Sequence, residues 1–344
     1  MKSKLVGLDI GSNTIKIASL KQTGQSYFIE SIAQAPTTPR GMMSDAIADL
    51  GAIGEVIKQL FVSSGIKNRE VSLCLPENLV YTKVIEMPQL SLQELSAALK
   101  FEMEQYIPLP IEKVKTDWQI LGSNDDEGRH TMNVMIIAAP TSVLDKYQKV
   151  MDYVGLTAES IETEITAVHR SLSPLLTAST FTNMIVHIGA TATTIAIIRA
   201  GIIKMVFSIN VGGVSLTRSI SIELGIDMVQ AENYKKAYGL NPNAFEGKIA
   251  RVLEPVLRSV VGDIKKAILS FREKYNNESI KQVILSGGSA LLPGIDVMLT
   301  NALSTQVVLG NSIAAYNIQN APSELQVEVP SYNVVFGLAL RNLI

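Results

Sequence analysis

Two segments far apart in the chain share one pattern of apolar and polar positions. Residues 5–18 and residues 184–197 each read as an apolar strand, then Ile-Gly, then a turn rich in small and hydroxyl residues, then a second β-branched strand. This pattern predicts a β-hairpin in each segment. Gly11 and Gly189 mark the two turns about half the chain apart, a spacing too long for a solenoid repeat. We therefore expect two similar lobes, each opening with a hairpin.

The stretch between the hairpins follows a rhythm of its own. Residues 79–87 alternate between apolar and polar positions, as a half-buried strand does. Ser91 and Glu94 form a capping box, which opens a helix. Pro108 and Pro110 end that helix. The pattern continues with strands at 115–121 and 131–138 around a polar turn from Ser123 to Gly128, and with a helix from Ser142 to Val154. This run predicts a small α/β subdomain inserted between the hairpins.

Helical spacing of apolar residues dominates the second half of the chain. The predicted elements are helices at 214–239 (divided at Gly225) and 248–275, a buried strand at 282–286, a helix from Pro293, and an apolar helix at 332–344. Residues 311–330 are polar, and they predict mostly loop.

The whole pattern predicts an α/β protein of two lobes with one insertion. Lobe I comprises residues 1–78 and 156–183 with 330–344 returning to it, the inserted subdomain comprises 79–155, and lobe II comprises 184–329. A chain of 344 residues is long enough for two domains of ordinary size.

Composition narrows the function classes. The chain is 47% hydrophobic and 18% charged, which supplies well-packed cores and excludes a disordered protein. The formal net charge is −2, so we expect no nucleic-acid partner and no polybasic lipid-binding patch. No run approaches the roughly 20 apolar residues that cross a bilayer. Membrane association is expected only indirectly, through a partner or a surface helix.

The single cysteine bears on the cellular compartment of the protein. Cys74 lies in a strand-like apolar run, and alone it can form no intrachain disulfide. A reduced core thiol of this kind is typical of a cytoplasmic protein.

The first hairpin turn carries chemistry suited to phosphate. Its donors are Gly11, Ser12, Asn13 and Thr14. Clustered main-chain and hydroxyl donors can cradle phosphates, and glycine lets the backbone approach them closely. Asp9 at the strand end can hold hydrated Mg²⁺, and Lys16 can reach a β- or γ-phosphate. An ordinary tight hairpin explains the same turn, so this motif is weak alone.

Four further sets of candidate binding residues follow along the chain, and their order is informative. They are Gly189, Ala190 and Thr191 in the second turn, Gly212 and Gly213 at a helix start, Glu232, Lys235 and Lys236 on a helix, and Gly287, Gly288 and Ser289 after a strand. The N–H groups at Gly212–Gly213 suit an anion. Paired glycines at 287–288 admit a flat ring, and Glu232 can accept hydrogen bonds from a ribose. Tight turns and a solvated Glu232–Lys236 ion pair are the alternatives.

This order resembles the actin, sugar-kinase and DnaK-type superfamily along almost the whole chain. The matching motifs are residues 7–16 and 186–194 (phosphate), 284–294 (adenosine), and the connecting helices at 164–167 and 336–339. The resemblance implies actin-like, duplicated ribonuclease-H-type lobes that close on ATP or ADP with Mg²⁺. It also implies that Asp9 binds the metal and that Asp9 and Glu164 position Mg²⁺ and water.

Within that superfamily the chain resembles the PilM family of type IV pilus proteins, and the inserted subdomain resembles its subdomain 1C. Residues 106–110, 138–156, 231–235 and 336–341 carry this likeness. It implies a cytoplasmic protein, peripheral at the inner membrane, that binds the N-terminal cytoplasmic tail of PilN. Pilus motor or platform proteins are possible further partners, as is self-association into a ring or filament. The groove for the tail is expected within residues 79–121.

One residue departs from the superfamily pattern. His187 stands where the second phosphate motif normally carries Asp. A neutral imidazole cannot replace a carboxylate in ordering Mg²⁺-bound water. We therefore expect ATP to be bound but hydrolysed slowly or not at all. An FtsA-like polymerising ATPase and a small-molecule kinase are the alternatives, although no further acidic motif demands the kinase's general base.

Overall fold

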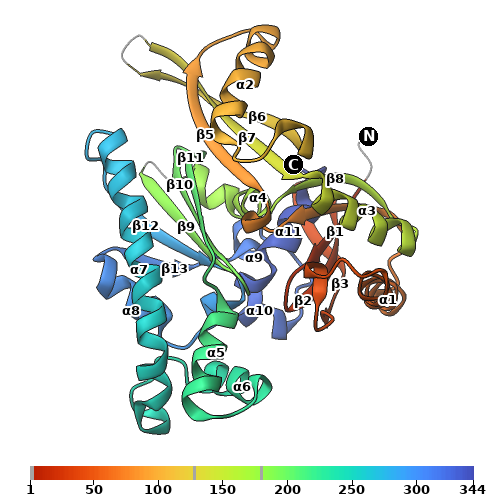
Figure 1. Ribbon diagram of the computed structural model, residues 1–344, viewed down its shortest axis with the longest axis vertical. Coiled ribbons are helices and arrows are strands. Elements are labelled where there is room, and N and C mark those ends of the chain that lie inside the picture. The colour runs from red at the N-terminus through yellow and green to blue at the C-terminus, as the bar shows by residue number, and fades with distance from the viewer. Residues whose placement is uncertain (1–3, 127–128, 179–180) are drawn as a thin grey trace.

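Two five-stranded sheets of the same design form the framework of the protein (Figure 1). The computed structural model describes residues 4–126, 129–178 and 181–344. The strand orders are β3-β2-β1-β4-β8 in lobe I and β11-β10-β9-β12-β13 in lobe II. In both sheets the first three strands are antiparallel and the last two run parallel to the third. The predicted duplication and both hairpins are therefore confirmed.

The structure confirms the strands of the two predicted hairpins, the strand-like run at Cys74 and the strand at 282–286, and it adds strands that were not predicted. The lobe I strands are β1 (Val6–Ile10), β2 (Thr14–Thr23), β3 (Ser26–Pro36), β4 (Glu70–Leu75) and β8 (Thr157–Thr163). The lobe II strands are β9 (Thr182–Ile188), β10 (Thr193–Arg199), β11 (Ile202–Ile209), β12 (Ile280–Ser286) and β13 (Gln306–Leu309). Cys74 is a buried free thiol in β4, as expected.

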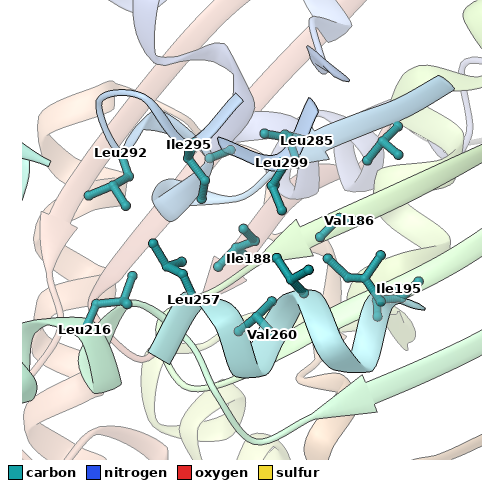
Figure 2. Close-up of a cluster of buried hydrophobic side chains, with 14 of the residues drawn as sticks. Val186, Ile188, Ile195, Leu216, Leu257, Val260, Leu285, Leu292, Ile295 and Leu299 are labelled. Carbon is teal, nitrogen blue, oxygen red and sulfur yellow. The ribbon is translucent and has the colours of Figure 1, made fainter. Parts of the chain in front are cut away.

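Long amphipathic helices cover lobe II. They are α5 (Gly213–Leu224), α6 (Met228–Tyr238), α7 (Lys248–Lys274) and α8 (Ile295–Leu303). Gly225 ends α5 in the left-handed conformation, which divides the predicted 214–239 run. Figure 2 shows the core between these helices and the sheet, where Leu257 and Val260 of α7 face strand residues such as Val186 and Ile195.

The inserted subdomain is a three-stranded sheet with one helix, at the top of Figure 1. Its strands are β5 (Tyr81–Pro88), β7 (Arg129–Pro140) and β6 (Val114–Asp126) in that spatial order, and its helix is α2 (Leu92–Tyr106). The capping box of Ser91 and Glu94 is present. Strands β6 and β7 are longer than predicted, and the tip of the predicted turn, residues 127–128, lies outside the described residues.

One predicted member of the inserted subdomain packs elsewhere. Helix α3 (Thr141–Val154) lies beside α1 (Ile47–Ser64) on lobe I (Figure 1). Its Tyr147, Val150 and Met151 belong to the core of the lobe I sheet. This packing favours an insertion that ends at Pro140, earlier than the predicted residue 155.

Residues 311–330 are more regular than the predicted loop. They contain two short helices, α9 (Ser312–Ala315) and α10 (Ser323–Glu328). These helices are too short for their apolar residues to show a helical period, so the polar composition of the segment dominated the prediction. Within the ranges that the structure describes, no helix is both long and apolar enough to cross a bilayer.

Two central helices, α4 (Glu164–Thr177) and α11 (Asn333–Leu340), pack directly on each other. A Cβ at Gly337 of α11 would overlap the carbonyl oxygen of Ala167, and one at Gly7 of β1 would overlap that of Val335. Only glycine permits these approaches. Glu162 fastens the same junction, because Arg170 and Arg341 both donate to its carboxylate, at 2.6 and 2.7 Å.

We expect Gly337→Ala to lower the free energy of unfolding by about 3 kcal/mol, because the added methyl group forces α4 and α11 apart. Gly262→Ala is the matched control, since Gly262 also lies in a helix but a Cβ there meets no atom within 4 Å. That control should stabilise the protein by about 0.5 kcal/mol through helix propensity. Urea unfolding measures both variants, and equal midpoints would contradict the close-packing argument.

Candidate functional site

A cavity of about 410 Å³ opens between the two lobes, at the turns of both hairpins. Glu164 lines it, and so does every predicted binding residue but one. The predicted residues in the lining are Asp9, Gly11, Ser12, Asn13, Thr14, Lys16, Gly189, Ala190, Thr191, Gly213, Glu232, Lys235, Lys236, Gly287, Gly288 and Ser289. Gly212 is the exception. Residues more than 270 positions apart in the chain thus share one cavity.

The first hairpin places a buried acid beside a buried base. Asp9 and Lys16 are cross-strand partners in β1 and β2, and they are 7% and 8% exposed. Burial raises the pKa of Asp9, while the positive charge of Lys16 opposes that rise. Burial also lowers the pKa of Lys16, and the negative charges of Asp9 and Glu328 oppose that fall. Lys16 Nζ donates to Thr14 Oγ1 at 2.6 Å, so the turn holds the ammonium group in place.

The second turn and the Gly212–Gly213 turn bind each other. The N–H groups of Gly213 and Val214 donate to the carbonyl oxygens of Gly189 and Ala190, at 2.9 and 2.8 Å. The expectation that these N–H groups receive an anion is therefore wrong for Gly213. A Cβ at Gly212 would lie 2.7 Å from both carbonyl oxygens. Gly212 thus acts by allowing close packing rather than by lining the cavity.

The Gly287–Gly288 turn combines a strained glycine with an open one. Gly287 has φ +89°, and a Cβ there would overlap the backbone of Ile188. A Cβ at Gly288, in contrast, meets no atom within 4 Å. Gly287 is therefore required by packing, whereas Gly288 leaves a bare stretch of backbone at the cavity wall.

Helix α6 presents an ion cluster to the cavity. Glu232 accepts from Lys235 Nζ at 2.7 Å and lies 3.5 Å from Lys236 Nζ. Lys235 also donates to Gly213 O and Thr217 Oγ1, at 3.0 and 2.9 Å. Burial opposes the charge on Glu232, yet the hydrogen bonds from Lys235 and Thr217 bring its pKa below the usual value. Lys235 therefore fastens α6 to α5, while the Lys236 side chain is 71% exposed at the rim.

His187 lines the cavity and belongs to a buried hydrogen-bond network. Its Nδ1 lies 3.1 Å from Ser286 Oγ, which also accepts from Asn333 Nδ2 at 3.1 Å. Burial lowers the pKa of His187 to about 4, and the charge of Lys16 contributes. The imidazole is therefore neutral at pH 7.

A second carboxylate lies near Asp9. Glu164, at the start of α4, has its pKa raised to about 8 by burial and by the nearby charges of Asp9 and Glu77. Without a cation it is therefore mostly protonated at neutral pH. Within the described part of the chain, no cluster of three or more His, Cys, Asp or Glu side chains is arranged to hold a metal ion.

Some lining residues were not among the predicted site residues. They are Gln34, Pro76, Asn78, Ala192, Leu291, Leu292, Glu328, Ser331 and Val334. Leu291 and Leu292 fall within the 284–294 motif, and Ala192 within the second phosphate motif. Glu328 comes from the predicted loop and Ser331 directly follows it, and nothing in the local pattern marks either residue as facing a cavity.

The duplicated sheets, the central helices and the cavity between the lobes define an actin-like protein. The family described as "Type IV pilus assembly protein PilM" matches residues 7–343. The chain therefore belongs to the PilM family.

Known proteins agree with this assignment. The structure titled "PilM-PilN type IV pilus biogenesis complex" is 25% identical, with a TM-score of 0.88 and complete coverage of both chains. Cell division protein FtsA of Streptococcus pneumoniae is 23% identical over 97% of this chain and 79% of its own length. MreB5 of Spiroplasma citri, in a structure titled as bound to AMPPNP, shares the fold at 15% identity and a TM-score of 0.54, over 100% of this chain and 97% of that one.

We expect His187 to give the protein a measurable acid sensitivity. Its pKa is lower in the folded state than in the unfolded chain, so between pH 6.5 and 4 only the unfolded chain binds this proton. The free energy of unfolding should therefore fall as the pH falls through that window, by at most about 1.4 kcal/mol per pH unit from this residue. Above pH 6.5 the contribution vanishes.

Urea unfolding of the wild type and His187→Asn across pH 4–8 measures this slope. The variant should lose stability less steeply below pH 6.5, because asparagine does not titrate. His169, whose pKa burial also lowers, is present in both proteins and cancels from the difference. Parallel curves would contradict the assignment.

Proposed function

We propose that this protein binds ATP with Mg²⁺ between its lobes and presents a groove to the cytoplasmic tail of a PilN-type inner-membrane protein. The observation that carries the nucleotide half is the convergence of both hairpin turns, α6 and the Gly287–Gly288 turn on one cavity. That cavity, at about 410 Å³, falls within the range of small-molecule sites.

The lining residues fit distinct parts of the nucleotide. Asp9 suits Mg²⁺, which takes one or two carboxylates and completes its shell with water and phosphate oxygens. The turn donors and Lys16 suit the phosphates, and Glu232 suits the ribose. The bare backbone at Gly288 suits the flat adenine ring. Bound Mg²⁺ would neutralise phosphate charge, and Glu164 would orient the water beside it.

Hydrolysis is proposed to be slow. His187 is neutral at pH 7 and bonded to Ser286, so it supplies no negative charge opposite Asp9. The cleft then holds the nucleotide as a structural ligand that keeps the lobes together, rather than as a substrate turned over rapidly.

The second half of the proposal concerns a groove of about 260 Å³ at the base of the inserted subdomain. Its lining is largely apolar and comprises Glu77, Val80, Tyr81, Thr82, Lys83, Tyr106, Ile107, Ile136, Val206 and Ser208. Strands β5 and β11 are both edges of their sheets, and both contribute to this lining. An extended peptide can pair with such an edge and fill side-chain pockets beside it.

The relative with a TM-score of 0.88 is in a structure titled as a complex with PilN, which supports a PilN-type tail as the peptide. Binding it would hold this chain at the cytoplasmic face of the inner membrane. Pilus motor or platform proteins, and assembly into a ring or filament, would be further contacts of the same complex.

We expect Asp9→Ala to weaken binding of MgATP by roughly 100-fold, since the variant removes a metal ligand and leaves Lys16 without its buried counter-charge. Calorimetric titration measures the affinity, with Asp145→Asn on α3 as a control that leaves the cavity intact.

The wild type should release phosphate far more slowly than the ~10 s⁻¹ of a typical enzyme. Equal affinity in Asp9→Ala would refute the site, and ordinary turnover would refute slow hydrolysis.

We expect a synthetic peptide matching the N-terminal tail of the PilN-type protein of the same organism to bind the groove. Tyr106→Ala should weaken that binding at least tenfold, because Tyr106 is a half-exposed aromatic anchor stacked under Lys83, 5.2 Å from the ring. Phe101→Ala is the matched control, since Phe101 is 72% exposed on the same helix but does not line the groove. Fluorescence anisotropy with a labelled peptide measures the affinity of both variants. An equal loss of affinity in Tyr106→Ala and Phe101→Ala would place the peptide outside this groove.

A further inference from the structure

One short segment forms a wall of both cavities. Pro76 and Asn78 line the cavity between the lobes, whereas Glu77 and Val80 line the groove. The segment makes a 3-10 turn, η2 (Glu77–Leu79), in which the Leu79 N–H donates to Pro76 O at 3.0 Å. Successive residues of one tight turn therefore face two different ligand sites.

Glu77 is the unusual member of this segment. It is only 3% exposed, and neither carboxylate oxygen makes a hydrogen bond of good geometry with any described residue. Burial raises its pKa, although the Thr82 and Thr163 hydroxyls and the Ile165 N–H lie near enough to oppose that rise. A buried carboxylate in this state is stabilised by any ligand that brings it a donor.

The same residue is connected to the cleft through its backbone. The N–H of Glu77 faces the carboxylate of Glu164 and opposes the rise of its pKa. In return, the N–H of Ile165, the residue after Glu164, faces the carboxylate of Glu77. Glu164 lines the cavity between the lobes. Any shift of Glu77 toward a ligand in the groove therefore moves a group that faces Glu164.

We propose that Glu77 receives an N–H donor from the peptide bound in the groove, and that the turn around it couples peptide binding to nucleotide binding. The donor is a main-chain amide, an amino terminus or a basic side chain. This inference rests on the proposed function, because it needs both ligands. A nucleotide in contact with Pro76 and Asn78 fixes the turn, so the peptide then has less disorder to remove. Linkage requires the peptide to tighten nucleotide binding by the same factor.

The test is the affinity of the PilN-type tail peptide with and without ATP and Mg²⁺, in the full chain, by calorimetry. In the wild type we expect the nucleotide to tighten peptide binding at least about fivefold. In Glu77→Gln, which keeps the shape of the side chain, that factor should fall below about two. Nucleotide affinity without peptide is measured in the variant as well, because loss of the Glu77 charge also acts on Glu164, and the coupling factor is taken relative to that value. The melting temperature of the variant should not be lower.

Lys83→Gln is the matched control. Lys83 lines the same groove but is exposed on β5 and takes no part in the turn. Its substitution should weaken peptide binding both with and without nucleotide. The factor by which nucleotide tightens peptide binding should stay at its wild-type value. If Lys83→Gln also lost the effect of the nucleotide on peptide binding, any substitution that weakens the peptide would have the same result. That outcome would overturn the role of Glu77.

The outcomes separate this inference from the proposed function. No peptide binding in any condition would overturn the proposed function and this inference with it. Peptide binding that is equal with and without nucleotide leaves the proposed function standing and overturns the coupling. The same nucleotide effect in the wild type and Glu77→Gln overturns the assignment of that coupling to Glu77.

Discussion

The architecture depends on one close contact, the direct backbone packing of α11 against α4 on one side and β1 on the other. Gly337 and Gly7 make it possible, since a methyl group at either position would overlap a carbonyl oxygen. The cavity follows from this contact, because both helices begin at its wall, α4 with Glu164 and α11 with Val334 in its first turn. Glu162 forms ion pairs with Arg170 and Arg341 at the same junction, so charge pairing adds to the close packing beside the site.

The two lobes share a fold but not a chemistry. The first hairpin ends in a buried carboxylate, Asp9, whose charge is opposed by burial and supported by Lys16. At the equivalent place in lobe II stands a neutral imidazole, His187, bonded to Ser286. Acidic groups therefore gather on the lobe I side of the cleft, where the charge of Asp9 helps to raise the affinity of Glu164 for protons when no cation is present. A divalent cation would be the natural counter-charge for such a wall, and it would fix the orientation of the proposed nucleotide.

Local rules of sequence predicted the parts of the structure that local physics decides. The hairpins, the Ser91–Glu94 capping box and the division of α5 from α6 at Gly225 follow from patterns within a few residues. The packing of α3 on lobe I did not follow, because its apolar stripe fits either neighbour and only the tertiary fold chooses. The role of Gly212 was missed for the same reason. A glycine pair before a helix predicts an anion site, but here the N–H of Gly213 already donates to Gly189.

The duplication explains why the groove and the cavity between the lobes come to share a wall. Strand β4 occupies the place in its sheet that β12 occupies in the other, so the residues after each strand reach the same cleft. After β12 the chain turns at Gly287–Gly288 and stays in lobe II. After β4 it passes through Pro76–Val80 and leads into the inserted subdomain. An insertion at this point must begin at the wall of the cleft. A ligand held at the base of the insertion would therefore lie one turn of backbone away from the proposed nucleotide site.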